Sequence, residues 1–207
     1  VGRMEVVTLW PLSQQEMAGT TGNWVDAMFS GSKPVAPSRP CDLGELRRRL
    51  AAGGFPEALA RLRPDRRAKW YESYVTTLLQ REVRDLAQVE DLATFPRLLA
   101  LAAARTAQLT NLSDLGRAAG LPNTTLRRYM ALLEGVFLLH YLPAWSTNRT
   151  KRVTRSPKLH LTDSGLAAHL VGLDEGVTTG AGVNLGALVE TFAVTEVLRQ
   201  RDVSSTR

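Results

Sequence analysis

AGLPNTTLRRYMALLE, residues Ala119–Glu134, combines the end of one helix, a tight turn and the start of a second helix. Gly120 is typical of a helix C-terminus, and after Leu-Pro the side chain of Asn123 can cap a helix that runs to about Glu134. Upstream, Asn111 or Ser113 can cap a short preceding helix. Two short helices joined by a turn that contains glycine are typical of a helix-turn-helix motif.

The segments on either side extend this motif. Upstream, Thr94 is expected to cap a helix whose core face carries Phe95, Leu98, Leu99 and Ala102. Downstream, VFLLHYL (136–142) and KLHLT (158–162) have strand character, and the polar and basic stretch STNRTKRVTRSP (146–157) connects them. Three helices followed by a β-hairpin predict a winged helix-turn-helix over residues 94–172.

Helical patterns predominate elsewhere in the chain. Ser13 and Glu16 have capping-box spacing. The other expected helices are a short one at Trp24–Phe29, one from Asp42 to Gly53, a long amphipathic one over Asp65–Val89, one from Thr162 or Asp163 to Leu170, and a last one over Ala187–Arg201. One apolar strand is expected within Val1–Trp10, and we expect the first 40 residues to be loose without a sheet to pair with. The predicted fold class is mainly α: a helical region plus a winged helix-turn-helix with a small β-hairpin.

Composition limits the kind of partner. The chain has 207 residues, of which 44% are hydrophobic and 22% charged, enough for one or two modest domains. Its formal net charge of +6 favours anionic partners such as nucleic acid. Cys41 is the single cysteine and the three histidines lack metal-ligand spacing, so a reducing cytoplasm and no bound metal are expected. No apolar run approaches the roughly 18 residues that cross a bilayer, so no membrane partner is expected.

Candidate DNA contacts lie in two places. On the helix from Asn123, one face carries Leu126, Met130 and Leu133, which leaves polar side chains free at the end that a recognition helix presents to base edges. The connector between the strands is basic and has no carboxylate, as expected for a wing along a sugar-phosphate backbone. The candidate nucleic-acid-binding residues are Thr124, Thr125, Arg127, Arg128, Asn148, Arg149, Lys151, Arg152, Arg155 and Lys158. The alternative is that this face only meets water or docks a protein.

No enzyme active site is expected in this chain. It lacks the GxxxxGK[ST] phosphate loop, HExxH, GxSxG and paired CxxC motifs, so it has no predicted catalytic residue and no cofactor of its own. Asp163 is expected to be a helix cap, and Glu82 and Asp85 to belong to a solvated helix face beside arginines. Cys41 is expected to be a loop thiol before a helix, and the tryptophans to be packing residues rather than base-stacking platforms.

Several motifs in a fixed order carry a family resemblance. TLWPLSQQE, GGFPEAL, WYESYVTTLLQREVRDL, the stretch from LLALAAARTAQLTNL to HYLPAW, SPKLHLTDSGLAAHL and LVETFAVTEVLRQ together resemble the C-terminal part of prokaryotic predicted ATPases of the AAA+ superfamily. In that family a P-loop ATPase domain precedes a C-terminal domain of unknown function, which includes a winged helix and ends in a fold similar to restriction endonucleases.

The resemblance implies a role for particular stretches. Val1–Glu16 match the end of the ATPase domain, Gly53–Glu57 match the family's Gly-Gly-x-Pro-Glu turn, and Asp163–Leu166 match its Asp-x-Gly-Leu. Glu190 matches the glutamate that opens the first helix of the nuclease-like domain, whereas Glu82 stands where the family usually has aspartate. The phosphate loop, the metal-binding acids and the nuclease-like acidic residues are missing.

The resemblance therefore implies four regions in a chain that is truncated at both ends. These are a remnant of an ATPase domain plus a loop (1–40), a helical linker region (41–93), the winged helix (94–172), and a loop with the first nuclease-like helix (173–207). The implied function is that of a non-catalytic C-terminal fragment of an ATP-binding protein, whose intact form binds ATP and Mg and whose winged helix contacts double-stranded DNA, the missing ATPase half or another protein. The alternative is a stand-alone DNA-binding regulator.

Overall fold

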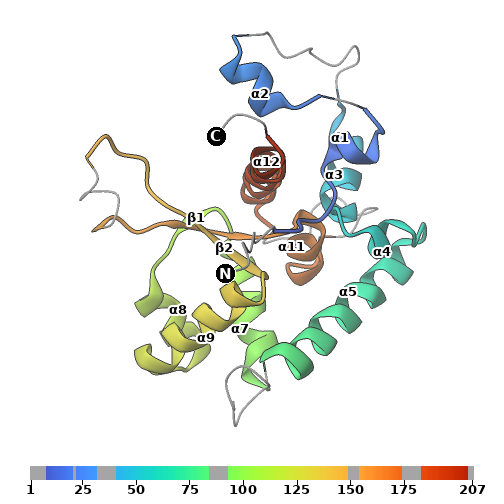
Figure 1. The fold of residues 1–207 in the computed structure, drawn as a ribbon. Helices are drawn as coiled ribbons and strands as arrows, with labels where there is room; N and C mark the ends of the chain where they lie inside the picture. Colours follow the sequence, from blue (N-terminus) through green and yellow to red (C-terminus); the bar gives the residue numbers. More distant parts are fainter. Residues whose placement is uncertain are drawn as a thin grey trace, which may run out of the picture.

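The structure, a computed structural model, describes residues 8–20, 22–31, 41–83, 93–148, 154–173 and 183–204. Its elements are α1 (Gln14–Met17), α2 (Trp24–Phe29), α3 (Leu43–Ala52), α4 (Pro56–Leu59), α5 (Pro64–Leu78), the π-helical turn η1 (Leu79–Val83), α7 (Thr94–Ala103), β1 (Gln108–Leu109), α8 (Leu112–Ala119), α9 (Asn123–Gly135), β2 (Leu139–Leu142), β3 (Lys158–Leu161), α11 (Ser164–Leu170) and α12 (Leu185–Asp202). The described part is mainly α, as predicted, with one small antiparallel sheet (Figure 1).

The winged helix-turn-helix consists of α7, α8, α9 and a three-stranded sheet. The strands lie in the order β1-β3-β2, and β2 pairs with β3 in the register of a hairpin, with His140 opposite His160. The two-residue strand β1 was not predicted, because its burial has no alternation that a strand pattern would reveal. As predicted, Phe95, Leu98, Leu99 and Ala102 of α7 are buried in the core.

Two helix starts differ from the sequence prediction by one residue. Thr94 and Asn123 were expected to cap α7 and α9, but each is the first residue of its helix, and the cap positions are Ala93 and Pro122. Neither cap position makes a side-chain hydrogen bond. Asn111 rather than Ser113 caps α8, with its side chain accepting from the Asp114 amide.

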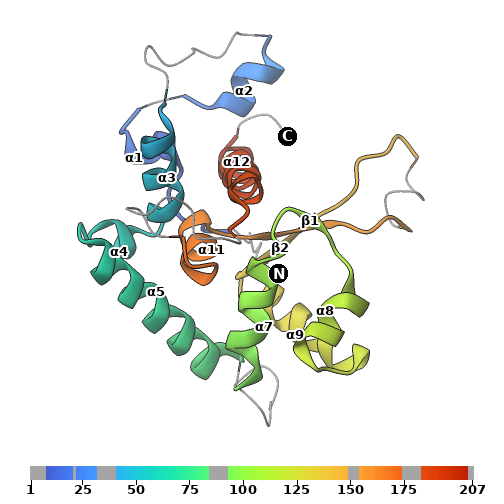
Figure 2. The ribbon, with the colours of Figure 1, turned by 180° about the vertical axis from the view of Figure 1, so that it is seen from behind.

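The core continues from the winged helix into the rest of the molecule through α11. This short helix packs against α3, α5, α7, α12 and β3, and every residue from Leu161 to Ala168 is buried. Figure 2 shows α11 between the diagonal helix α5 and the steep helix α12. The long amphipathic helix expected over Asp65–Val89 is α5 followed by η1, and residues 84–90 lie outside the described residues.

The N-terminal segment is folded against the last helix. Asn23 donates from Nδ2 to the Gln200 carbonyl at 2.6 Å, and the Trp24 amide donates to the Gln200 side chain at 2.7 Å. The Trp10 indole donates to Asp202 at 2.6 Å. The expectation that the first 40 residues are loose is therefore wrong for 8–20 and 22–31, because their partner is α12 and not a sheet. Residues 8–10 are not a strand, and the start of that predicted strand lies outside the described residues.

Candidate nucleic-acid interface

The exposed face of α9 carries the first group of predicted contact residues. Leu126, Tyr129, Met130 and Leu133 are buried and fix the rotation of the helix. Thr124, Arg127 and Arg128 are exposed on the other side, and Thr125 is half-buried. Gly120, at a φ of 72°, ends α8 in the left-handed conformation and lets the chain turn sharply into α9.

The charges around this face are unbalanced. Neither Arg127 nor Arg128 forms an ion pair with a carboxylate among the described residues; the Arg128 guanidinium lies 5.5 Å from the Tyr129 ring centroid. The first turn of α9 has no acidic residue, and no side chain caps its amide groups. Unoccupied amides and the positive end of the helix dipole favour an anion at this end of α9.

The position of α8 is fixed by ion pairs and hydrogen bonds to α7. Arg105 forms an ion pair with Asp114 at 3.0 Å, and Arg97 donates to the Ala118 carbonyl at 2.9 Å. Asp114 lies in the first turn of α8 and Ala118 in its last turn, so both ends of α8 are held beside α7 and the turn that follows it.

The β2–β3 hairpin forms a long arm, which carries the second group of predicted contact residues. It leaves the body on the same side as α8 in both views (Figures 1 and 2). Asn148 and Arg155 are exposed on it. Arg149, Lys151 and Arg152 lie outside the described residues. Lys158, at the base of the arm, forms an ion pair with Glu190 of α12, so its ammonium is already engaged by a carboxylate.

Trp145, on the same arm, is a residue that the sequence analysis missed. Its side chain is 79% exposed, so the expectation that the tryptophans are packing residues is wrong here. Trp24 is also 45% exposed, whereas Trp70 is half-buried and stacks on Tyr74. The only signal in the sequence is the position of Trp145 in a Pro- and Ser-containing stretch that has no apolar periodicity.

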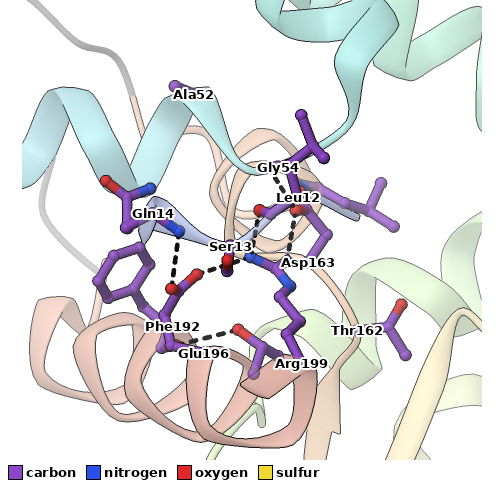
Figure 3. Close-up of polar contacts among 12 residues, drawn as sticks. Leu12, Ser13, Gln14, Ala52, Gly54, Thr162, Asp163, Phe192, Glu196 and Arg199 are labelled. Carbon is purple, nitrogen blue, oxygen red and sulfur yellow. Dashed lines mark hydrogen bonds and ion pairs between the residues drawn. The ribbon is translucent and has the colours of Figure 1, made fainter. Parts of the chain in front are cut away.

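The most conspicuous buried carboxylate serves the fold. Asp163 caps α11, as predicted, by accepting from the Leu166 amide at 2.9 Å. The same carboxylate also accepts from the Gly54 amide at 2.8 Å and from Arg199 Nη2 at 3.1 Å (Figure 3). The Tyr71 hydroxyl donates to it at 3.1 Å. Burial raises the pKa of Tyr71, which keeps its hydroxyl protonated as a donor. Four donors leave Asp163 no free position for catalysis.

Arg199 links this carboxylate to the N-terminal segment. Its Nη1 donates to the Leu12 carbonyl at 3.0 Å and to Glu196 at 2.8 Å (Figure 3). Glu196 in turn accepts from the Gln14 amide at 2.8 Å. We call Asp163, Glu196 and Arg199, with the backbone groups they bind, the buried polar hub. The hub joins residues 12–14, the Gly53–Gly54 turn, α11 and α12.

The glycines of the GGFPE and DSGL motifs allow this close approach. A Cβ on Gly165 would lie 2.2 Å from the Tyr71 hydroxyl and 2.7 Å from the Gly53 amide nitrogen. Gly53 itself has a φ of 66°. These two motifs, among the several that carry the family resemblance, are therefore explained by packing and by helix termini.

A second buried cluster attaches α12 to the sheet. His160 Nδ1 lies 3.2 Å from the Thr191 hydroxyl, which lies 2.7 Å from the Thr106 hydroxyl. Burial lowers the pKa of His160 from 6.5 to about 4, so the ring is neutral at physiological pH. This cluster is structural, because the side chains of all three residues are buried and bind one another.

The other predicted polar groups are at the surface. Glu57 pairs with Arg61 at 3.0 Å, Glu82 is exposed on η1, and Asp85 lies outside the described residues. Cys41 is an exposed thiol next to the cap residue of α3, as expected. Within the described ranges no group of three or more metal-ligating side chains is brought together, and no helix is long and apolar enough to cross a membrane.

Comparisons with known proteins relate the chain to proteins without an assigned function. A family model with the description "Domain of unknown function (DUF8612)" matches residues 43–176. The curated relatives "Uncharacterized protein Rv2008c" of Mycobacterium tuberculosis (strain ATCC 25618 / H37Rv) and "Uncharacterized protein Mb2031c" of Mycobacterium bovis (strain ATCC BAA-935 / AF2122/97) are each 31% identical over 145 residues. The aligned part is 70% of this chain and 33% of each relative, so the chain spans about a third of the length of these relatives. No solved structure matches it.

Proposed function

Because the chain belongs to the DUF8612 family, a domain of unknown function, we propose a function from its surface: it is a non-catalytic module that binds duplex DNA through its winged helix. The observation that carries this proposal is the exposed pair Arg127 and Arg128, which has no carboxylate partner among the described residues. Arginine binds phosphate and the guanine edge with two parallel hydrogen bonds, so unpaired arginines on a recognition helix favour DNA.

The geometry supports contact along one side of a duplex. In the proposed complex the N-terminal half of α9 enters the major groove, where Thr124 and Arg127 reach base edges and Arg128 reaches a phosphate. The arm then lies along the adjacent backbone, with Asn148 and Arg155 as donors and with Arg149, Lys151 and Arg152 adding positive charge to that segment of sequence. Lys158 contributes less, because its ammonium is held by Glu190.

We further propose that the module acts within a longer ATP-binding protein of the AAA+ type, in the cytoplasm. The support is the ordered set of motifs and the length of the relatives, of which this chain spans about a third. ATP and Mg would bind to the P-loop domain of that longer protein. In this proposal the hub couples ATP binding to DNA binding. Residues 12–14, which resemble the end of the ATPase domain, are hydrogen-bonded to α12. If the purified chain alone hydrolyses ATP at enzyme-like rates, this part of the proposal is wrong.

Binding of a labelled blunt duplex, followed by fluorescence anisotropy across a salt series, tests the DNA proposal. The variant Arg127→Ala/Arg128→Ala should weaken binding at least about tenfold, and it should reduce the slope of log K against log salt by about 0.9, because Arg128 supplies one phosphate contact of the proposed complex. The matched control is Arg66→Ala/Lys69→Ala, which removes the same charge from exposed positions on α5.

Each outcome has a distinct meaning. An equal loss in both variants would show that only net charge matters and would contradict a defined interface. No binding at low salt would reject DNA as the partner and direct the search to a protein. Strong preference for one sequence over random duplex, without nucleotide, would favour the alternative of a stand-alone regulator.

A further inference from the structure

A basic hollow lies at the start of α5, on the side of the molecule opposite the arm. It has a volume of about 780 Å³ and is formed by the loop 60–63 and the first turns of α5. In both views α4 and the start of α5 lie on one side of the body, and α8 and the arm lie on the other (Figures 1 and 2). A straight duplex held by α9 and the arm is therefore not expected to reach this hollow.

The wall of the basic hollow is positively charged. It has four cationic side chains and no carboxylate; the cations are Arg61, Arg63, Arg66 and Lys69. Glu57 and Asp65, which lie outside the wall, pair with Arg61 and Arg63 at 3.0 Å. Arg66 and Lys69 are exposed and form no ion pair with any residue that the structure describes. Four cations and two paired carboxylates leave an excess of two positive charges, so the occupant should be anionic.

Apolar surface lies among these cations. Leu62, in the loop before α5, is 87% exposed on the wall of the hollow. Trp70, which is half-buried, forms another apolar part of the wall. A leucine that projects into water beside a hollow gains free energy when an apolar group covers it. The occupant should therefore present an apolar group together with its negative charge.

The surroundings of Trp70 argue against a nucleic acid as the occupant. Its ring stacks on Tyr74, with the centroids 5.1 Å apart, and the Arg61 guanidinium lies 6.0 Å from its centroid. A base needs an open ring face on which to stack, and these contacts already use the ring. Phosphate groups alone would meet the cations but would leave Leu62 in water. A flat membrane surface would not fill a concave site.

An acidic protein segment supplies both kinds of group. Its carboxylates can bind Arg66 and Lys69, and a guanidinium holds a carboxylate through two parallel hydrogen bonds. We propose that the basic hollow is a docking site for an acidic segment of a partner protein, whose apolar side chain packs on Leu62 between the cations. Arginine clusters recognise acidic motifs in this way. Because the hollow and α9 use different residues, the chain can hold the partner and a duplex at once.

Fluorescence anisotropy with two labelled peptides tests the apolar contact. One probe is a short peptide of glutamates around a single leucine, and the matched probe has glycine in place of that leucine. The wild-type chain should bind the leucine probe about fivefold more tightly, because part of the leucine is buried. Leu62→Ala should remove this preference. The control Leu9→Ala, which replaces a leucine that is 95% exposed outside the hollow, should keep it.

A pair of double variants tests the charged contact. Arg66→Ala/Lys69→Ala should weaken binding of both peptides about tenfold, because it removes the two cations that have no described partner. Arg127→Ala/Arg128→Ala removes the same charge from α9 and should change peptide binding less than about twofold. All of these side chains are exposed, so the variants should fold as the wild type does.

The outcomes separate this docking site from the DNA interface. If the leucine adds no affinity, or if both double variants weaken the peptides equally, the docking site is overturned. It is also overturned if Arg66→Ala/Lys69→Ala weakens duplex binding as much as peptide binding, since the hollow would then attract any polyanion. Failure of the DNA proposal looks different: no variant binds the duplex, and the peptide results are unchanged.

Discussion

Asp163 shows at the residue scale how one carboxylate can serve several parts of a fold. Its capping role was predictable from the local order Thr-Asp-Ser-Gly-Leu. Its bonds to Gly54, Tyr71 and Arg199 were not, because these partners lie 36 to 109 positions away in the chain. The candidate site likewise has a predictable and an unpredictable part. Helical periodicity predicts that the two arginines of α9 are exposed, whereas no sequence pattern predicts the exposure of Trp145.

Replacing this carboxylate should leave the buried cation of Arg199 with one carboxylate partner, Glu196, in place of two. Asp163→Asn keeps the size of the side chain but removes the charge that faces Arg199, whose side chain is only 3% exposed. We expect the free energy of unfolding to fall by about 3 kcal/mol in urea titrations. Asp65→Asn, which breaks the exposed pair with Arg63, should change it by less than about 1 kcal/mol. Equal effects would contradict the assigned role of the hub.

His160 should make stability depend on pH. Its pKa is lowered in the folded state to about 4, from 6.5, so the unfolded chain binds the extra proton. The contribution of His160 to stability is therefore complete above pH 6.5 and is lost as the pH falls toward 4. At pH 5 the wild type should lose about 2 kcal/mol more, relative to pH 7.5, than His160→Leu does. Urea unfolding at both pH values measures this, and parallel losses in the two proteins would refute it.

At the scale of single elements, three helix caps could be predicted from the local sequence, whereas those of α7 and α9 were placed one residue too late. Asn111, Asp42 and Asp163 cap their helices as expected, because a cap is a contact between residues three positions apart. The strand β1 was missed, since two residues carry no pattern and pairing with β3 depends on residues about 50 positions later. The break of the long helix into α5 and η1 also has no sequence signal that we recognised.

Two helical glycines should respond oppositely to alanine. Gly165→Ala places a methyl group against Tyr71 and the Gly53 backbone, so α11 must move from the α3 terminus, at a cost of about 2–3 kcal/mol. Gly135→Ala, at the end of α9, meets open space and should stabilise by up to about 1 kcal/mol. Thermal unfolding of both variants checks the signs. A neutral Gly165→Ala would show that the contact between α3 and α11 is looser than described.

On the scale of the whole molecule, α12 holds distant parts together. It binds residues 10–24 through Asp202, Gln200, Glu196 and Arg199, and the sheet through Thr191 and Glu190. The weak segregation of apolar and polar residues around this helix follows from partners on several sides. The family resemblance implies that this helix begins a nuclease-like domain, whereas the first 40 residues were expected to be loose because no sheet was predicted for their strand to pair with.

Hydrogen exchange should reveal this linkage as shared protection. Glu196→Ala removes the acceptor of the Gln14 amide and one partner of Arg199, so amides in residues 12–29 and in the second half of α12 should exchange faster together. Amides of α7, α8 and α9 should be unaffected. Glu190→Ala removes a half-exposed carboxylate from the same helix and serves as the control. Faster exchange confined to α12 would contradict the linkage.

The bond between Trp10 and Asp202 spans 192 positions, and this separation bears on how the chain is made. Residues 8–31 are synthesised before α12, so the N-terminal segment leaves the ribosomal exit tunnel before its partner exists. Until α12 has been synthesised, the side chain of Val25 in α2, which is buried in the fold, has no surface to cover it. Contacts of such long range also close slowly. The nascent chain therefore passes through a stage in which this segment is exposed to other proteins, including chaperones.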